Sequence, residues 1–122
     1  MIHRRRRGTA IVDTPNGILV VNTGERTYYL PGGGAKMVES RRSAVIRELF
    51  EETGLRATKC SYLFEYTSHY NLHKVFLIEA TGVAKPRKEI KNLAYFNGSN
   101  VNISDTTRRI IEMYNEKKNV KK

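Results

Sequence analysis

The chain has 122 residues, 39% of them hydrophobic, which is enough for the core of one ordinary domain and argues against wholesale disorder. Its formal net charge of +10 favours polyanionic partners such as nucleotides, polyphosphates or RNA, although basic chain ends that serve only solubility explain it equally well. No apolar run approaches the roughly 20 residues of a membrane span, so we expect no membrane association. The single cysteine, Cys60, excludes an intrachain disulfide and predicts a reducing, cytoplasmic setting.

The first third of the chain predicts short strands that lead into a glycine-rich loop. Two apolar runs flank the turn signal Pro15-Asn16-Gly17 and are typical of a pair of strands. A third short apolar segment leads to Pro31 and then to residues 32–34, which are all glycine. Such a run predicts a loop without regular structure, in which the backbone can approach a ligand closely. The three apolar segments are residues 8–14, 18–21 and 28–30.

The rest of the chain predicts two helices and three strands. Residues 39–53 have the clearest helical periodicity, and Gly54 follows as a typical C-terminal glycine. Ser104 is the expected N-cap of a last helix, which we expect to fray after Glu116. The buried face of that helix is expected to comprise Thr107, Ile110, Ile111 and Tyr114. The strands are expected at residues 57–68, 75–81 and 93–96, and the loops at 68–74, which carries His69, Tyr70 and His73, and at 85–91, which is charged.

The helix at residues 39–53 concentrates negative charge in a basic chain. Only 12 acidic residues occur in the sequence, and four of them lie within this segment. At about 100° per residue, Glu48, Glu51 and Glu52 share one face, and Arg47 offsets only part of their repulsion. By themselves, these carboxylates read more simply as a solvated helix face. Placed after a glycine-rich loop, they also suit a hard divalent cation and a diphosphate.

Residues 33–55 resemble the Nudix box of the Nudix hydrolase family, which includes MutT-like enzymes. The family's pattern is a glycine, five residues, a glutamate, seven residues, Arg-Glu, an apolar residue, any residue, Glu-Glu, any residue, a glycine and an apolar residue. Every defined position matches, and Tyr28-x-Leu30-Pro31-Gly32-Gly33 resembles the usual lead-in. Two variable positions depart from the commonest form, with Lys36 in place of an acidic residue and Val38 in place of glycine. The matching positions are Gly33, Glu39, Arg47, Glu48, Leu49, Glu51, Glu52, Gly54 and Leu55.

This resemblance implies a fold, an activity and a set of site residues. The fold is the α/β Nudix fold, a mixed β-sheet sandwiched between helices, which would form a single domain over residues 1–122. The activity is the hydrolysis of a phosphoanhydride bond with Mg²⁺ or Mn²⁺ as cofactor. The implied ion ligands are Glu48, Glu51, Glu52 and the Gly33 carbonyl. Arg47 would orient the carboxylates, and Glu39 and Gly54 would be structural.

The base that takes a proton from the attacking water is one of these carboxylates or one outside the box. Glu89 is our candidate outside the box, because it lies in the charged loop where related enzymes often supply a carboxylate. Glu65 and Glu79 compete with it as strand residues that could face the same cleft. The alternative for Glu89 is an ordinary loop charge.

Three residues are candidates for substrate binding. Arg7, next to the first strand, could reach substrate phosphates. Tyr28 could stack on a base, although core or rim packing is its alternative. Tyr70 follows the box by about the distance at which diadenosine polyphosphate hydrolases of the family place a tyrosine, and its alternative is an exposed loop aromatic. We interpret His69 and His73 as loop residues.

The sequence leaves the substrate open within the class of nucleoside diphosphate-linked molecules. A MutT-like reaction, in which a nucleoside triphosphate yields the monophosphate and pyrophosphate, is the first hypothesis. Dinucleoside polyphosphates, ADP-ribose and the 5′ end of RNA are alternatives. A non-catalytic module that binds a nucleotide or RNA is a further alternative, and a homodimer is expected as often as a monomer.

Overall fold

The computed structural model describes residues 3–120, and within this range it contains seven strands and two helices. Met1, Ile2 and two lysines of the basic C-terminus, Lys121 and Lys122, lie outside it. Among the described helices, none combines the length and the apolar character that crossing a membrane requires. The elements are β1 (Arg5–Ile11), β2 (Asp13–Thr14), β3 (Gly17–Asn22), β4 (Gly32–Gly34), α1 (Arg41–Thr53), β5 (Arg56–Thr67), β6 (Asn71–Thr81), β7 (Asn92–Phe96) and α2 (Asp105–Val120).

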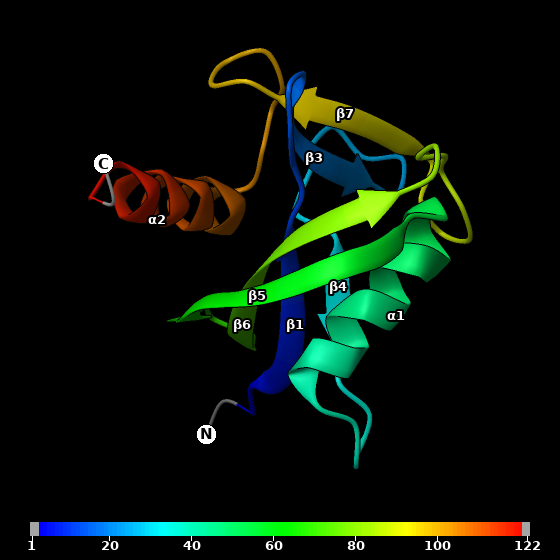
Figure 1. The fold of residues 1–122 in the computed structure, drawn as a ribbon, viewed down its shortest axis with the longest axis vertical. Coiled ribbons are helices and arrows are strands. Elements are labelled where there is room, and N and C mark those ends of the chain that lie inside the picture. The colour runs from blue at the N-terminus through cyan, green and yellow to red at the C-terminus, as the bar shows by residue number, and fades with distance from the viewer. Residues whose placement is uncertain (1–2, 121–122) are drawn as a thin grey trace.

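The strands form two sheets that meet where β1 passes into β2 (Figure 1). The larger sheet has the order β4-β1-β6-β5, in which β1 and β6 are parallel and the other neighbours are antiparallel. The smaller sheet has the order β2-β3-β7 and is antiparallel throughout. A mixed sheet of this kind needs cover on both faces, because the parallel pair lies at its centre.

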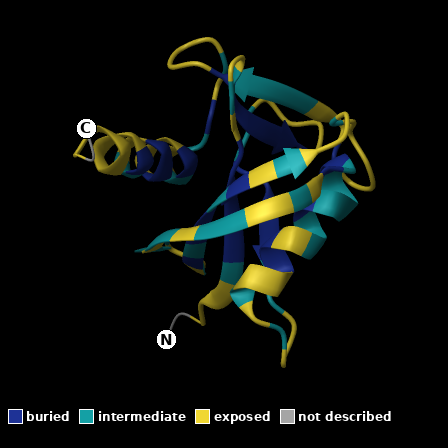
Figure 2. Cartoon of the chain, viewed as in Figure 1, coloured by how far each residue is buried: buried dark blue, intermediate teal, exposed yellow. Residues whose placement is uncertain are grey.

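The two helices provide that cover from opposite sides (Figures 1 and 2). Successive side chains of a strand point to opposite faces, and neighbouring residues of β1 follow this rule. Ala10 packs in one core cluster with Val45 and Leu49 of α1, whereas Ile11 packs in another with Ile110 of α2. Burial of each such aliphatic side chain stabilises the fold by about 1.5–3 kcal/mol. The α/β/α arrangement implied by the sequence is therefore confirmed.

Helix α1 has the C-terminal cap that the sequence indicated and an N-terminal cap that it did not. Gly54 has a left-handed φ of 78°, and its N–H donates to the carbonyl oxygen of Phe50 at 2.8 Å. At the other end, the hydroxyl of Ser40 accepts from the N–H of Ser43 at 3.0 Å. The helix therefore begins at Arg41, two residues later than predicted, and Glu39 is left in the preceding loop.

The prediction that residues 32–34 lack regular structure is wrong. These glycines form the edge strand β4, antiparallel to β1, with Gly33 opposite Gly8. The side of this pair that faces α1 has no room for side chains. A Cβ on Gly8 would lie 2.2 Å from the carbonyl oxygen of Arg41, so glycine lets the helix approach the strand closely.

Three further boundaries differ from the expectations. Strand β6 begins at Asn71, so His73 is a buried strand residue and not a loop residue. Strand β1 begins at Arg5, because its arginines pair with residues 71–73 of β6. Helix α2 continues beyond Glu116 to Val120, and it buries the predicted face. That face comprises Thr107, Ile110, Ile111 and Tyr114.

Candidate functional site

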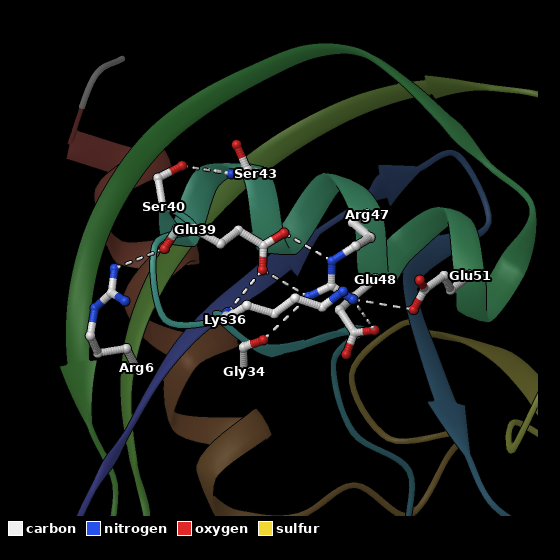
Figure 3. A network of polar contacts seen from close by, with 9 residues as sticks. All are labelled: Arg6, Gly34, Lys36, Glu39, Ser40, Ser43, Arg47, Glu48 and Glu51. Carbon is white, nitrogen blue, oxygen red and sulfur yellow. Dashed lines mark hydrogen bonds and ion pairs between the residues drawn. The ribbon is translucent and has the colours of Figure 1, made fainter.

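Arg47 ties the loop before α1 to the carboxylates of the helix (Figure 3). Its Nε and Nη2 donate to the two carboxylate oxygens of Glu39, each at 2.9 Å, and this bidentate pair lowers the pKa of Glu39 to about 2. Its Nη1 donates to Glu48 at 3.2 Å and to Glu51 at 3.3 Å. Because Nη2 also lies 3.4 Å from the carbonyl oxygen of Gly34, one guanidinium fixes the loop, the edge strand and the helix together.

Two carboxylates of α1 lie directly against the glycine strand. The Glu48 carboxylate fills the space beside Gly33, where an added Cβ would lie 1.7 Å from Glu48 Oε2. Glu52 reaches the start of the same strand, where its Oε1 accepts the Gly32 N–H at 3.2 Å. The absence of side chains in β4 therefore gives these carboxylates access to the backbone of the edge strand.

Burial and the hydrogen bond between Glu48 and Glu51 shift the pKa values of the three helix carboxylates. Burial raises the pKa of Glu52 to about 7, and the nearby charges of Glu48 and Glu89 add to the effect. Burial and a hydrogen bond with Glu51 raise the pKa of Glu48, and the same hydrogen bond lowers the pKa of Glu51. Burial therefore favours the protonated forms of Glu48 and Glu52 in the metal-free protein, whereas a divalent cation would favour their ionised forms.

The side-chain positions are not yet those of a completed ion site. Within residues 3–120, no three His, Cys, Asp or Glu side chains are grouped so that they could hold one metal ion. Glu48 and Glu51 are turned toward Arg47, and Glu52 is turned toward the Gly32 N–H. The chemistry of the donors nevertheless fits Mg²⁺ or Mn²⁺, because carboxylate and carbonyl oxygens are the ligands these ions prefer.

A pocket of about 370 Å³ opens between β1, β6 and the start of α2, on the sheet face opposite α1. Arg7 lies at the side of the pocket that borders the α1 carboxylates. Its guanidinium is close enough to Glu52 and Glu48 for their charges to act on it. Its Nη2 donates to the carbonyl oxygen of Leu30 at 3.0 Å, which holds the side chain across the edge of the sheet. The pocket is lined by Arg7, Thr9, Tyr29, Leu30, Ser68, His69, Tyr70, Asn71, His73, Ser104, Thr106, Thr107 and Ile110.

The structure places the two predicted tyrosines differently. Tyr70 lines the pocket and is 68% exposed, with its ring edge-to-face against His69. Tyr28 is not among the lining residues; it packs against the α2 core cluster and pairs with Ile103. Its neighbour Tyr29, which the sequence did not single out, lines the pocket instead.

Of the three carboxylates considered outside the box, Glu89 lies closest to the site. Its loop is held to the end of α1, because the N–H of Arg87 donates to the carbonyl oxygen of Glu52 at 3.0 Å. Glu89 is exposed there, and its charge raises the pKa of Glu52. Glu65 and Glu79 are exposed and lie near Arg41 at 3.7 Å and Lys59 at 3.9 Å, respectively.

Sequence reasoning missed the polar residues beneath the pocket. Thr9 and His73 are 1% and 5% exposed, and they lie on the neighbouring strands β1 and β6. The alternation of Arg7, Thr9 and Ile11 along β1 was the available signal for Thr9, because these side chains share one face. No such signal existed for His73 while its strand was expected to begin at residue 75.

Comparison with known proteins gives a consistent picture. The family model described as the NUDIX domain matches residues 2–113. A crystal structure from Chromobacterium violaceum, assigned to the nudix hydrolase family, is 40% identical with a TM-score of 0.87, and the match covers 93% of this chain and 77% of that one. A comparison with curated protein sequences finds no match.

Two more distant solved structures share the fold. The MutT NUDIX hydrolase from Burkholderia pseudomallei is 20% identical with a TM-score of 0.77, covering 91% of this chain and 98% of that one. A bifunctional NMN adenylyltransferase/ADP ribose pyrophosphatase from Francisella tularensis, complexed with AMP and Mn ion, is 22% identical. Its TM-score is 0.71, and the match covers 96% of this chain and 42% of that one. At these identities the likeness shows the fold alone.

Proposed function

Because the chain belongs to the Nudix hydrolase family, whose members act on phosphoanhydride bonds, we propose that it is a MutT-like nucleoside triphosphate pyrophosphohydrolase. The observation that carries this proposal is the position of Arg7, which borders both the α1 carboxylates and the pocket. A nucleoside triphosphate has two parts that match these two neighbours, a nucleoside for the pocket and phosphates for the carboxylate side. The products are the nucleoside monophosphate and pyrophosphate.

Each residue of the site then has a proposed role. Glu48, Glu51, Glu52 and the Gly33 carbonyl hold Mg²⁺ or Mn²⁺, which when bound neutralises the phosphates and stabilises charge on the phosphorus oxygens. Arg47 and Glu39 keep the loop and helix aligned, and Gly54 ends the helix. Arg7 binds a phosphate oxygen, with Tyr29 and Tyr70 at the nucleoside. Tyr28 has only a structural role.

The attacking water needs a group to accept its proton. Glu52 is our first choice, because burial raises its pKa to about 7, and a pKa near the working pH suits a general base. Glu89 is the second choice, since it is exposed beside Glu52 and can rotate into the site. Glu89→Gln tests the second choice, because a large loss of kcat in that variant would point to Glu89, whereas Glu52→Gln lowers kcat whether Glu52 acts as the base or as an ion ligand.

The proposal is tested by a phosphate-release screen, coupled to inorganic pyrophosphatase for the triphosphates and to alkaline phosphatase, which acts on the phosphomonoester products, for the other substrates. The substrates are nucleoside triphosphates including 8-oxo-dGTP, dinucleoside polyphosphates and ADP-ribose, each with Mg²⁺ and with Mn²⁺. We expect metal-dependent turnover of a triphosphate, and a loss of about 10²–10⁴-fold in the Glu52→Gln variant. Turnover confined to another substrate would contradict the substrate assignment. Nucleotide binding without turnover would favour a binding module.

One observation favours a second candidate substrate, the 5′-triphosphate end of RNA. A hollow of about 370 Å³ lies beside the loop that precedes α1, and its lining residues are His3, Arg4, Arg5, Arg6, Ala35, Lys36 and Met37. Four of these side chains are cationic and none is acidic, which suits the backbone of a longer polyanion. Replacement of Arg4 and Arg5 by glutamine should weaken hydrolysis of triphosphorylated RNA more than that of a mononucleotide. An equal effect on both would contradict this second candidate.

A further inference from the structure

A chain of hydrogen bonds runs from Arg7 beneath the pocket and does not involve the Nudix box. Arg7 Nε lies 3.1 Å from Thr9 Oγ1, and Thr9 Oγ1 lies 2.7 Å from His73 Nδ1. His73 Nε2 lies 3.0 Å from Ser68 Oγ, which in turn lies 3.4 Å from the carbonyl oxygen of Asn71. This chain of hydrogen bonds thus connects β1, β6 and the loop that presents His69 and Tyr70 to the pocket.

The two ends of this hydrogen-bonded chain favour one direction for its bonds. A guanidinium can only donate, so the Thr9 hydroxyl accepts from Arg7 and has its own hydrogen available for His73 Nδ1. If Nδ1 accepts, the proton of the neutral ring is on Nε2, which donates to Ser68. The Ser68 hydroxyl then donates to the carbonyl of Asn71, which can only accept.

The surroundings of His73 keep its ring neutral, as this direction requires. Burial and the positive charge of Arg7 lower the pKa of His73 to about 4. An imidazolium would donate at both nitrogens, and the Thr9 hydroxyl would then receive donors from both sides without an acceptor for its own hydrogen. Near neutral pH the ring therefore serves as an acceptor on one side and a donor on the other.

We propose that His73 is a positioning residue that holds the Arg7 guanidinium at the border between the carboxylates and the pocket, and at the same time holds the pocket loop through Ser68. This proposal rests on the proposed function and deepens it, because it makes recognition of the nucleoside side depend on the same ring that aligns a phosphate-binding arginine. Arg7 uses Nε for Thr9 and Nη2 for Leu30, so its other N–H groups keep a fixed direction.

Matched variants separate this role from simple packing. Thr9→Val keeps the shape of the side chain and breaks the hydrogen-bond relay from Arg7 through Thr9 to His73, whereas Thr9→Ser keeps the hydroxyl. We expect Thr9→Val to raise KM for the nucleoside triphosphate about tenfold, with a smaller change in kcat, and Thr9→Ser to restore it. Equal kinetics of Thr9→Val and the wild type, with both proteins folded by circular dichroism, would overturn the proposal.

Substitutions of His73 test its hydrogen bonds with Thr9 and with Ser68 separately. His73→Asn retains an acceptor near Thr9, His73→Gln retains a donor near Ser68, and His73→Phe retains neither. We expect the Gln variant, which loses the contact with Thr9, to show the tenfold increase in KM, the Asn variant, which loses only the contact with Ser68, to show a smaller increase, and the Phe variant to show the largest. Equal kinetics for all three variants would contradict an action through Thr9.

A spectroscopic measurement is independent of turnover. In protein labelled with ¹⁵N-histidine, a two-bond ¹H–¹⁵N correlation spectrum distinguishes the ring tautomers, and the His73→Asn variant assigns the signal. We expect the neutral Nε2–H form of His73 between about pH 6 and 8. A protonated Nδ1 would overturn the relay. If no substrate is hydrolysed, the proposed function fails, while this spectrum and calorimetric titration of AMP into Thr9→Val and Thr9→Ser still decide the relay.

Discussion

Arg47 acts through the geometry of its guanidinium, and this is testable with a substitution that preserves its charge. Lysine cannot make the bidentate pair with Glu39 while also contacting Glu48 and Glu51. We therefore expect Arg47→Lys to lower kcat/KM by about 10–100-fold while the protein remains folded. The control is Arg42→Lys on the same helix, since Arg42 stacks on Phe76 outside the site. Equal losses in both variants would show that the effect is on the helix and not on the carboxylates.

Glu52 illustrates a conflict between stability and function at a single residue. Its pKa of about 7 in the folded protein lies above the ordinary value of 4.5, so the folded state binds the proton more tightly than the unfolded state. The stability gained from this proton is complete below pH 4.5 and is lost as the pH rises through 7. At alkaline pH without metal, the ionised carboxylate therefore destabilises the folded protein.

Glu52→Gln should remove this cost, because the amide cannot ionise and its oxygen can still accept the Gly32 N–H. In EDTA at about pH 8, we expect the variant to be more stable than the wild type by on the order of 2 kcal/mol, with a smaller difference at about pH 5. Urea denaturation at both pH values measures the difference. A variant that is destabilised equally at both would refute the linkage, and Glu65→Gln, an exposed change elsewhere, controls for loss of charge.

At the scale of elements, the junction between α1 and the edge of the sheet depends on two glycines that oppose one another. A Cβ on Gly8 would meet the backbone of α1, namely the carbonyl oxygen of Arg41 at 2.2 Å and the nitrogen of Val45 at 2.9 Å. The three atoms nearest to a Cβ on Gly33 would all belong to the side chain of Glu48. Backbone cannot move without shifting the helix, whereas a side chain can rotate.

The two alanine variants should therefore fail in different ways. We expect Gly8→Ala to lower the free energy of unfolding by about 1–3 kcal/mol, because the helix must move away from β1. Gly33→Ala should keep most of its stability and lose turnover, because the Glu48 carboxylate is displaced. Chemical denaturation and steady-state kinetics on both variants test this contrast. A Gly33→Ala enzyme with wild-type kcat would show that Glu48 does not need its place against β4.

The parts of the site that could be predicted from sequence are those built from local periodicity. The helical repeat placed Glu48, Glu51 and Glu52 on one face of α1, and Gly54 marked its end. The edge strand β4 could not be predicted, because glycine has no intrinsic preference for a strand. Gly32–Gly34 are extended only because β1 lies beside them and α1 lies above them, and both contacts are long-range in sequence.

The pocket was harder to predict for a related reason. Its residues come from β1, from the segment just before β4, from β6 and its preceding loop, and from the start of α2. Their meeting depends on the parallel pairing of β1 with β6. His73 lies opposite Arg7 in that register. A polar residue near a predicted strand end looks like loop, and only the neighbouring strand shows that it is buried. Tyr28 and Tyr29 were indistinguishable for the same reason, since alternate residues face opposite ways.

At the scale of the whole molecule, charge is distributed unevenly. The chain carries a net charge of +10, yet carboxylates gather on one face of α1. The cationic hollow formed by residues 3–6 and 35–37 lies beside the loop that joins that helix to β4. A surface of this kind attracts polyanionic substrates over a distance of about one Debye length, roughly 10 Å at 0.1 M salt. The attraction should therefore appear in the association step and not in the chemical step.

The salt dependence of the reaction tests this idea, and paired charge variants show where the attraction originates. Between about 50 and 300 mM KCl at constant free Mg²⁺, we expect kcat/KM for a nucleoside triphosphate to fall about tenfold while kcat changes little. Replacing Arg4 and Arg5 by glutamine should flatten this dependence. Replacing Lys59 and Lys117, which are exposed but line neither the hollow nor the pocket, removes the same charge and should leave it steep. If both pairs of substitutions flatten the salt dependence equally, the substrate is attracted by the net charge of the molecule and not by the hollow. Attraction by the hollow would depend on where the removed charges lie, whereas attraction by net charge would not.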